Sequence, residues 1–111
     1  QNIKVMEELN LPVANLIAVG GGTKNPVWMQ IVADVIGRPV CIPKVSIGAS
    51  YGEALMAALG VGALKDFHEL SSVIEPDRVI LPNEENTKIN RKYCDIYDKL
   101  YTANKDLMHL L

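Results

Sequence analysis

The sequence predicts a single α/β domain, in which a short sheet packs against helices and a long helix ends the chain. Three patterns support this fold class. The apolar run Asn15–Val19 ends in three glycines and leads into a capped helix. A second short run follows at Arg38–Pro43, and an apolar four-and-three repeat extends from Ile89 to Leu110. The chain has 111 residues, 49% of them hydrophobic, which is enough to bury one core.

The run Asn15–Val19 is predicted to be a buried strand that ends in a tight turn. Asn25 is suited to cap the following helix, and Pro26 suits its first position, where a missing N–H costs nothing. That helix should end at Gly37. Its apolar stripe toward the core is expected to consist of Val27, Trp28, Ile31, Val32, Val35 and Ile36. Gln30 and Asp34 share the opposite face, which is expected to meet solvent or another domain.

Arg38–Pro43 is bounded by prolines, so this strand is expected near a sheet edge. The next helix is expected from Ile47 to about Leu59. Its many glycines and alanines predict close packing against neighbouring backbone, because each Gly in an exposed helix costs up to ~1 kcal/mol.

Asp66 is a candidate cap for a short helix through Leu70, and Val79–Leu81 is a candidate third strand. Asn83 and two following acids mark the start of the last helix. Along this helix a narrow apolar seam recurs at spacings of four and three. The seam consists of Ile89, Tyr93, Ile96, Leu100, Ala103, Leu107 and Leu110. It predicts either a helix packed across its own domain or a coiled-coil homodimer.

Charge and composition exclude several classes of protein. The 11 Lys and Arg and 13 Asp and Glu residues give a formal net charge of −2, which argues against nucleic-acid binding. Cys41 and Cys94 are far apart and lack CxxC spacing, so reduced thiols in a cytoplasmic protein are expected. No apolar run reaches the roughly 20 residues that span a bilayer. The chain starts at Gln1, in what reads as the end of a helix, which predicts a piece of a larger protein.

The chemistry of the chain is expected at the turn Gly20–Asn25, between the first strand and the capped helix. Such turns expose backbone N–H groups at a positive helix end and can hold phosphate or ribose. A Rossmann fingerprint would need glycine where Asn25 stands and an acid where the next strand offers Lys44. The Gly-Lys-Ser/Thr series of a P-loop is absent. Both familiar nucleotide motifs are therefore excluded.

Catalytic and metal-binding residues are not expected in this chain. The acids Asp34, Glu53, Asp66 and Glu69 do not follow a strand as a catalytic carboxylate would. His68 and His109 are isolated from each other and from any Cys or acid at ligand spacing.

The segment Ala18–Val40, with its glycine turn and capped helix, closely resembles the C-terminal domain of the FGGY carbohydrate kinases. Gly48–Gly60 resembles the helix that follows in this family, and the tyrosine-rich Tyr93–Tyr101 is similar to its terminal helix. Glu53 stands where the family often has a small residue. The overall similarity to xylulose kinases implies a ketopentose such as xylulose as the substrate.

The resemblance implies part of a ribonuclease H-like, actin-like ATPase domain. Residues 1–111 would be the C-terminal part of the second, nucleotide-binding domain, with the first domain absent. The implied reaction is ATP-dependent phosphorylation of a sugar hydroxyl, with Mg²⁺ held mainly by parts outside this chain. The implied contacts to adenosine and the α-phosphate are Gly20, Gly21, Gly22, Thr23 and Asn25. The chain alone would be inactive.

Two other functions stay open from the residues. Another actin-like ATPase would share the glycine turn, although not the continuation from Gln30 to Val40. A non-catalytic assembly module would use the seam of the last helix. Under the kinase interpretation the partners are ATP and a small sugar, without nucleic acid or membrane.

Overall fold

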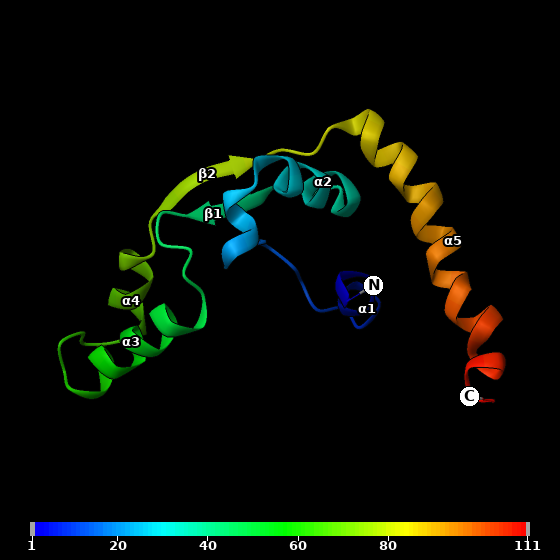
Figure 1. Cartoon of the computed structure of the whole chain (residues 1–111). Helices are drawn as coiled ribbons and strands as arrows, with labels where there is room; N and C mark the ends of the chain where they lie inside the picture. Colours follow the sequence, from blue (N-terminus) through cyan, green and yellow to red (C-terminus); the bar gives the residue numbers. More distant parts are fainter. Residues whose placement is uncertain (1, 111) are drawn as a thin grey trace.

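The structure, a computed structural model, describes residues 2–110 and has the shape of an arch (Figure 1). A small sheet and helix α2 form its middle, helices α3 and α4 form one end, and helix α5 forms the other. The radius of gyration is 18.1 Å, whereas a compact domain of this size has a value of about 13 Å. The elements are α1 Asn2–Glu8, the 3₁₀ turn η1 Gly21–Lys24, α2 Pro26–Ile36, β1 Val40–Pro43, α3 Ala49–Gly60, α4 Phe67–Val73, β2 Pro76–Ile80 and α5 Glu84–Met108.

Strands β1 and β2 form an antiparallel pair, with Val40 opposite Ile80 and an irregularity between Ile42 and Pro43. The predicted strand Val79–Leu81 thus exists as β2, which begins earlier in the chain. The small core lies between this sheet and α2, and it consists of Met29, Ala33, Val40 and Ile42.

The chain before the glycine turn lies along the other side of β1. Ile17 forms an isolated parallel bridge with Cys41: the Ala18 amide donates to the Cys41 carbonyl at 2.9 Å, and the Cys41 amide donates to Leu16 at 2.8 Å. Strand β1 is one of the two strands of the sheet, so it lies at a sheet edge as expected, with a single bridge to Ile17 on its other side. Pro39 precedes the strand and Pro43 ends it.

The prediction of a buried strand at Asn15–Val19 is only partly correct. The segment leads into the glycine turn as expected, but it makes one bridge to β1 rather than a ladder. Ile17 and Val19 are 56% and 58% exposed, because no other described element covers their side chains. The pairing ends where the chain turns away and the Gly20 amide donates to the Ser46 carbonyl at 2.6 Å.

Helix α2 has the predicted bounds. Its start is fixed by Asn25, whose Oδ1 accepts from the amides of Val27 and Trp28 at 3.0 and 3.1 Å. Its end is fixed by Gly37, which has φ of 70°, a left-handed conformation that favours glycine. Local capping chemistry therefore determines both ends of this helix.

The predicted apolar stripe of α2 is wrong for four of its six residues. Val27, Trp28, Ile31 and Val35 are exposed, whereas Met29, Ala33 and Asp34 face inward. Polar contacts favour this inward face, because Asp34 accepts from the Asn83 amide at the cap of α5 and Gln30 Nε2 donates to the Leu81 carbonyl and to Asp34. The expectation that Gln30 and Asp34 lie on a face toward solvent or another domain is therefore wrong for Asp34, which is buried against the described residues, whereas Gln30 is half-exposed.

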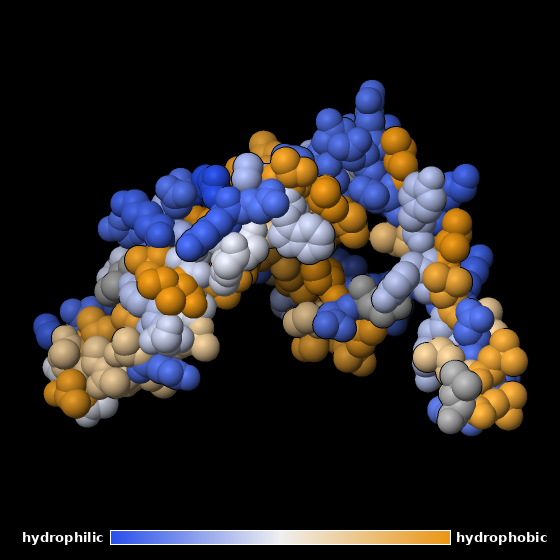
Figure 2. Space-filling model, in the orientation of Figure 1, coloured by the Kyte–Doolittle hydropathy of each residue, from blue (hydrophilic) through white to orange (hydrophobic). Residues whose placement is uncertain are grey.

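Helix α5 begins at the Asn83 cap, as predicted, and it packs over the C-terminal end of α2. The half-buried face of α5 comprises Thr87, Asn90, Cys94 and Asp98, and Asp98 pairs with Lys4 of α1 at 3.1 Å. The apolar seam lies on roughly the opposite side of the helix, with Leu100 50% and Leu107 65% exposed. Figure 2 shows apolar side chains along α5 on the visible surface. The seam is therefore not the surface by which α5 packs on the described residues.

Helices α3 and α4 form the other end of the arch. Helix α3 begins at Ala49, two residues later than predicted, and α4 is capped by Asp66, whose carboxylate accepts from the Glu69 amide at 2.8 Å. The expected close packing of α3 is not found among residues 2–110. No atom lies within 4 Å of where a Cβ would be on Gly52 or Gly60.

Candidate functional site

The glycine turn joins the Ile17 bridge to α2 and has a conformation that requires glycine at its first position. Gly20 has φ of 97°, which L-residues with a side chain rarely adopt, and its amide is bound to Ser46. Residues Gly21–Lys24 then form the 3₁₀ turn that ends at the Asn25 cap.

Thr23 is the buried residue of the turn and is only 3% exposed. Its hydroxyl lies 2.7 Å from the Gly20 carbonyl and 3.0 Å from the Ser46 hydroxyl, so it can donate to the first and accept from the second. Its carbonyl accepts a hydrogen bond of 2.9 Å from Arg78 Nη2 on β2. Thr23 is thus bound on three sides by protein.

Two amides of the turn remain open to a ligand. The Thr23 amide folds back to Gly20 and the Asn25 amide folds back to Gly22, both at 3.2 Å. The amides of Gly21 and Gly22 have no acceptor among the described residues. Both glycines are exposed, and the space beside Gly21 is empty to 4 Å. An anionic group can therefore approach these two N–H groups directly.

The surroundings of the open amides favour negative charge. They precede an 11-residue helix whose N-terminal dipole is positive. Lys24 is exposed in the same turn, and the Arg78 guanidinium lies against it. The indole of Trp28, which is 53% exposed, lies 3.4 Å from where a Cβ on Gly22 would be. The turn thus combines free N–H donors, positive charge and an aromatic side chain.

The five predicted contact residues are contiguous in this turn, but they are not equivalent. Gly21 and Gly22 present free amides, and Gly20 provides the bend. The Thr23 side chain points inward, so it holds the turn rather than a ligand. Asn25 uses its Oδ1 as a helix cap, while its side-chain nitrogen donates to no described residue.

Sequence reasoning did not identify Ser46 and Arg78 as part of the turn. They lie 23 and 55 residues from Thr23 in the chain, and neither belongs to a local motif. Only the pairing of β1 with β2 brings Arg78 to the glycine turn. No pattern in the sequence signals this contact.

Asp34, which is 3% exposed, belongs to a separate polar cluster. It accepts hydrogen bonds from the Asn83 amide at 2.7 Å, Asn86 Nδ2 at 2.9 Å and Gln30 Nε2 at 2.8 Å. The bond from the Asn83 amide, followed by that from Asn86, holds the pKa of Asp34 below its ordinary value of 3.8. The Asp34 carboxylate therefore joins α2 to the start of α5 by hydrogen bonds.

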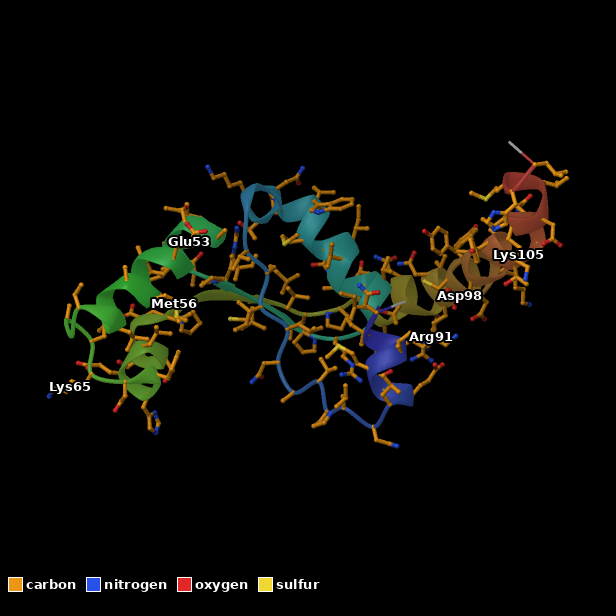
Figure 3. All side chains as sticks on the ribbon, turned by 90° about the horizontal axis from the view of Figure 1, so that it is seen from below. Glu53, Met56, Lys65, Arg91, Asp98 and Lys105 are labelled. Atoms are coloured by element: carbon orange, nitrogen blue, oxygen red, sulfur yellow. The ribbon has the colours of Figure 1, made fainter. Side chains whose placement is uncertain are left out.

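The other candidate acids have structural or solvent-exposed positions. Asp66 caps α4, and Glu69 accepts from the Lys65 amide at 2.7 Å. Glu53 lies on the exposed surface of α3, away from the sheet (Figure 3). None of the four acids is hydrogen-bonded to the glycine turn in the described part of the chain.

Residues 2–110 lack two features. No three His, Cys, Asp or Glu side chains come together at a spacing suited to a metal ion. No helix combines the length and the apolar character needed to cross a membrane.

Comparison with known proteins places these observations in a family. Residues 1–61 match the C-terminal domain of the FGGY family of carbohydrate kinases. The chain is 31% identical over 107 residues to a xylulose kinase of Staphylococcus epidermidis, covering 96% of this chain and 22% of that protein. It is 32% identical over 103 residues to the autoinducer-2 kinase of Escherichia coli, covering 92% of this chain and 19% of the relative. The chain thus spans about a fifth of the length of these relatives.

The fold gives the same result. The crystal structure of xylulose kinase from Rhodospirillum rubrum matches 97% of this chain and 22% of its own, with a TM-score of 0.77 and 25% identity. The predicted fold class, an α/β part of a ribonuclease H-like, actin-like ATPase domain, is confirmed by this match. The chain belongs to the FGGY family of carbohydrate kinases.

Proposed function

We propose that this chain is the nucleotide-binding part of an enzyme that uses ATP to phosphorylate a sugar hydroxyl. The observation that carries the proposal is the glycine turn, which presents the free amides of Gly21 and Gly22 at the start of α2. Membership of a carbohydrate kinase family supplies the reaction class. In phosphoryl transfer, such donors bind and orient the nucleotide and offset its negative charge.

Within this proposal, residues 1–111 are the C-terminal part of the second domain of a longer cytoplasmic enzyme. The catalytic base, most sugar contacts and the groups that hold Mg²⁺ then lie outside this chain, which is inactive alone. The exposed apolar face of α2, with Val27, Ile31 and Val35, supports this division, because such a face is normally covered. Domain closure over the nucleotide would exclude water during transfer.

The proposed contacts divide among the residues of the turn. Gly21 and Gly22 donate to the α-phosphate and ribose, and Gly20 and Thr23 maintain the bend that exposes them. Asn25 contacts the adenine through its side-chain nitrogen while Oδ1 caps α2. Among sugars, a ketopentose such as xylulose is the proposed substrate, because several of the similar proteins are named xylulose kinases.

Amide NMR of the 111-residue chain during titration with Mg-ATP tests the proposed nucleotide site. We expect shifts confined to Gly20–Asn25. Gly21→Val should abolish them, because its side chain would enter the open space beside the amides. Gly60→Val is the matched control, since Gly60 also has open space around it. Equal responses of both variants, or no response of the unmodified chain at millimolar nucleotide, would count against this turn as a nucleotide site.

A second function, self-association through α5, is favoured by one observation. The apolar seam lies opposite the face that packs on α2. One side of this helix therefore packs within the chain, and the other exposes apolar side chains. A homodimer through the seam is compatible with the kinase function. The other open alternative, a different actin-like ATPase, is set aside by the family match.

A further inference from the structure

Arg78 is the one residue of β2 whose side chain is hydrogen-bonded to the glycine turn among the described contacts. Its Nη2 donates to the Thr23 carbonyl at 2.9 Å, and its side chain remains 43% exposed. Within residues 2–110 its other charged neighbour is Asp77, whose carboxylate lies 3.8 Å from Arg78 Nε, too far for a hydrogen bond. The guanidinium is therefore directed at the turn.

The Thr23 carbonyl links the glycine turn to β2. The Thr23 amide and hydroxyl both bind the Gly20 carbonyl, which closes the turn on one side. The Arg78 bond fixes the carbonyl on the other side and so limits rotation of the peptide that follows Thr23. Gly20, Gly21 and Gly22 have no side chains to restrict their own conformations. A turn with three consecutive glycines needs such an external restraint to keep two amides directed outward.

We propose that Arg78 is a positioning residue for nucleotide binding, because its bond to the Thr23 carbonyl holds the glycine turn in the conformation that presents the Gly21 and Gly22 amides. This inference rests on the proposed function. A flexible turn would lose entropy on binding, whereas a restrained turn has already lost it. Arg78 thus acts through Thr23 and increases affinity without contacting the nucleotide.

The chain contains a closely matched control. Arg38 also donates a guanidinium hydrogen bond to a backbone carbonyl, from Nη1 to Val13 at 3.1 Å, and its side chain is 38% exposed. It also forms an ion pair with Glu7. Neither Val13 nor Glu7 belongs to the glycine turn. Substitution of Arg38 therefore reports what loss of an arginine's polar contacts does to stability when the glycine turn is not involved.

The test compares Arg78→Met and Arg38→Met in the 111-residue chain, by thermal unfolding and by NMR titration with Mg-ATP. Both variants should lower Tm. Only Arg78→Met should raise the Kd for Mg-ATP, by roughly 3- to 10-fold, the effect of one hydrogen bond. Arg78→Lys keeps a charged donor and should restore part of the affinity. Equal Kd values for the two methionine variants would overturn the inference.

A second readout does not depend on nucleotide binding. Without ligand, ¹⁵N relaxation should show larger motion of the Gly20–Asn25 amides in Arg78→Met and unchanged motion in Arg38→Met. If the unmodified chain does not bind Mg-ATP, the proposed nucleotide site at this turn fails, and relaxation alone decides whether Arg78 restrains the turn. Unchanged relaxation in Arg78→Met would reject that role.

Discussion

The two ends of helix α2 differ in how completely their polar groups are paired. Toward its C-terminus, the Asp34 carboxylate accepts three hydrogen bonds, and it is almost fully buried. At its N-terminus, the amides of Gly21 and Gly22 have no acceptor among the described residues and are exposed. Fully paired buried groups specify how elements pack, whereas unpaired exposed donors remain available to a ligand. The first end thus serves the fold, and the second is the better candidate for function.

The largest expected effect comes from Asp34→Asn. The new side chain would place an NH₂ group or a weaker acceptor against donors from Asn83, Asn86 and Gln30. We expect the largest fall in Tm of any substitution discussed here, together with faster hydrogen exchange at the start of α5. Glu53→Gln is the matched control, because Glu53 is exposed and should change stability by no more than about 0.5 kcal/mol. Similar Tm values for both variants would contradict the role of Asp34.

Acidification should remove the stability that the Asp34 carboxylate contributes. The folded-state pKa of Asp34 is lowered from 3.8, chiefly by the Asn83 amide, so its stabilisation is complete above that value. It is lost as the pH falls through the folded-state pKa. The stability difference between the unmodified chain and Asp34→Asn should therefore be constant near neutral pH and shrink between about pH 5 and about pH 2. Urea unfolding across this range measures it, and a difference independent of pH would show that the carboxylate charge is not responsible.

The two asparagine caps provide a smaller and more selective comparison. Asn25 caps α2 and Asn83 caps α5, each by accepting two amide hydrogen bonds. Replacing either with Ala should cost about 1 kcal/mol, or roughly 4–8 °C in Tm. Only Asn25→Ala should also weaken Mg-ATP binding in the NMR titration. If neither variant changes the affinity, Asn25 is a helix cap and its adenine contact is wrong.

Local rules explain which features could be predicted from the sequence. The caps Asn25, Asp66 and Asn83 and the left-handed Gly37 involve neighbours in the chain, and all four were correctly predicted. The glycine turn was located for the same reason.

Long-range polar contacts explain what could not be predicted. Asp34 meets Asn83 from 49 residues away, and Arg78 meets Thr23 from 55 residues away. The first contact turned a polar face of α2 inward, against the hydrophobic pattern. The second determined how the turn is restrained. Hydrophobic periodicity carries no information about either pairing, because it records burial and not the partner.

The smallest expected effect on monomer stability comes from Leu100→Asp in the seam of α5. Leu100 is 50% exposed and lies away from the face that packs on α2, so the monomer should change by no more than about 0.5 kcal/mol. Self-association, measured by sedimentation velocity over a range of concentrations, should be lost. Thr102→Asp is the control, because Thr102 is exposed and lies outside the seam.

The outcome also distinguishes the two interpretations of the seam. If Leu100→Asp lowers Tm at concentrations where the chain is monomeric, the seam must pack within the same polypeptide, because an unpaired surface leucine would not have that effect. If it changes only the concentration dependence, a second copy covers the seam. In that case α5 uses its polar face, through Asp98 and Asn90, for the fold and its apolar face for assembly, which reverses the usual arrangement of an amphipathic helix.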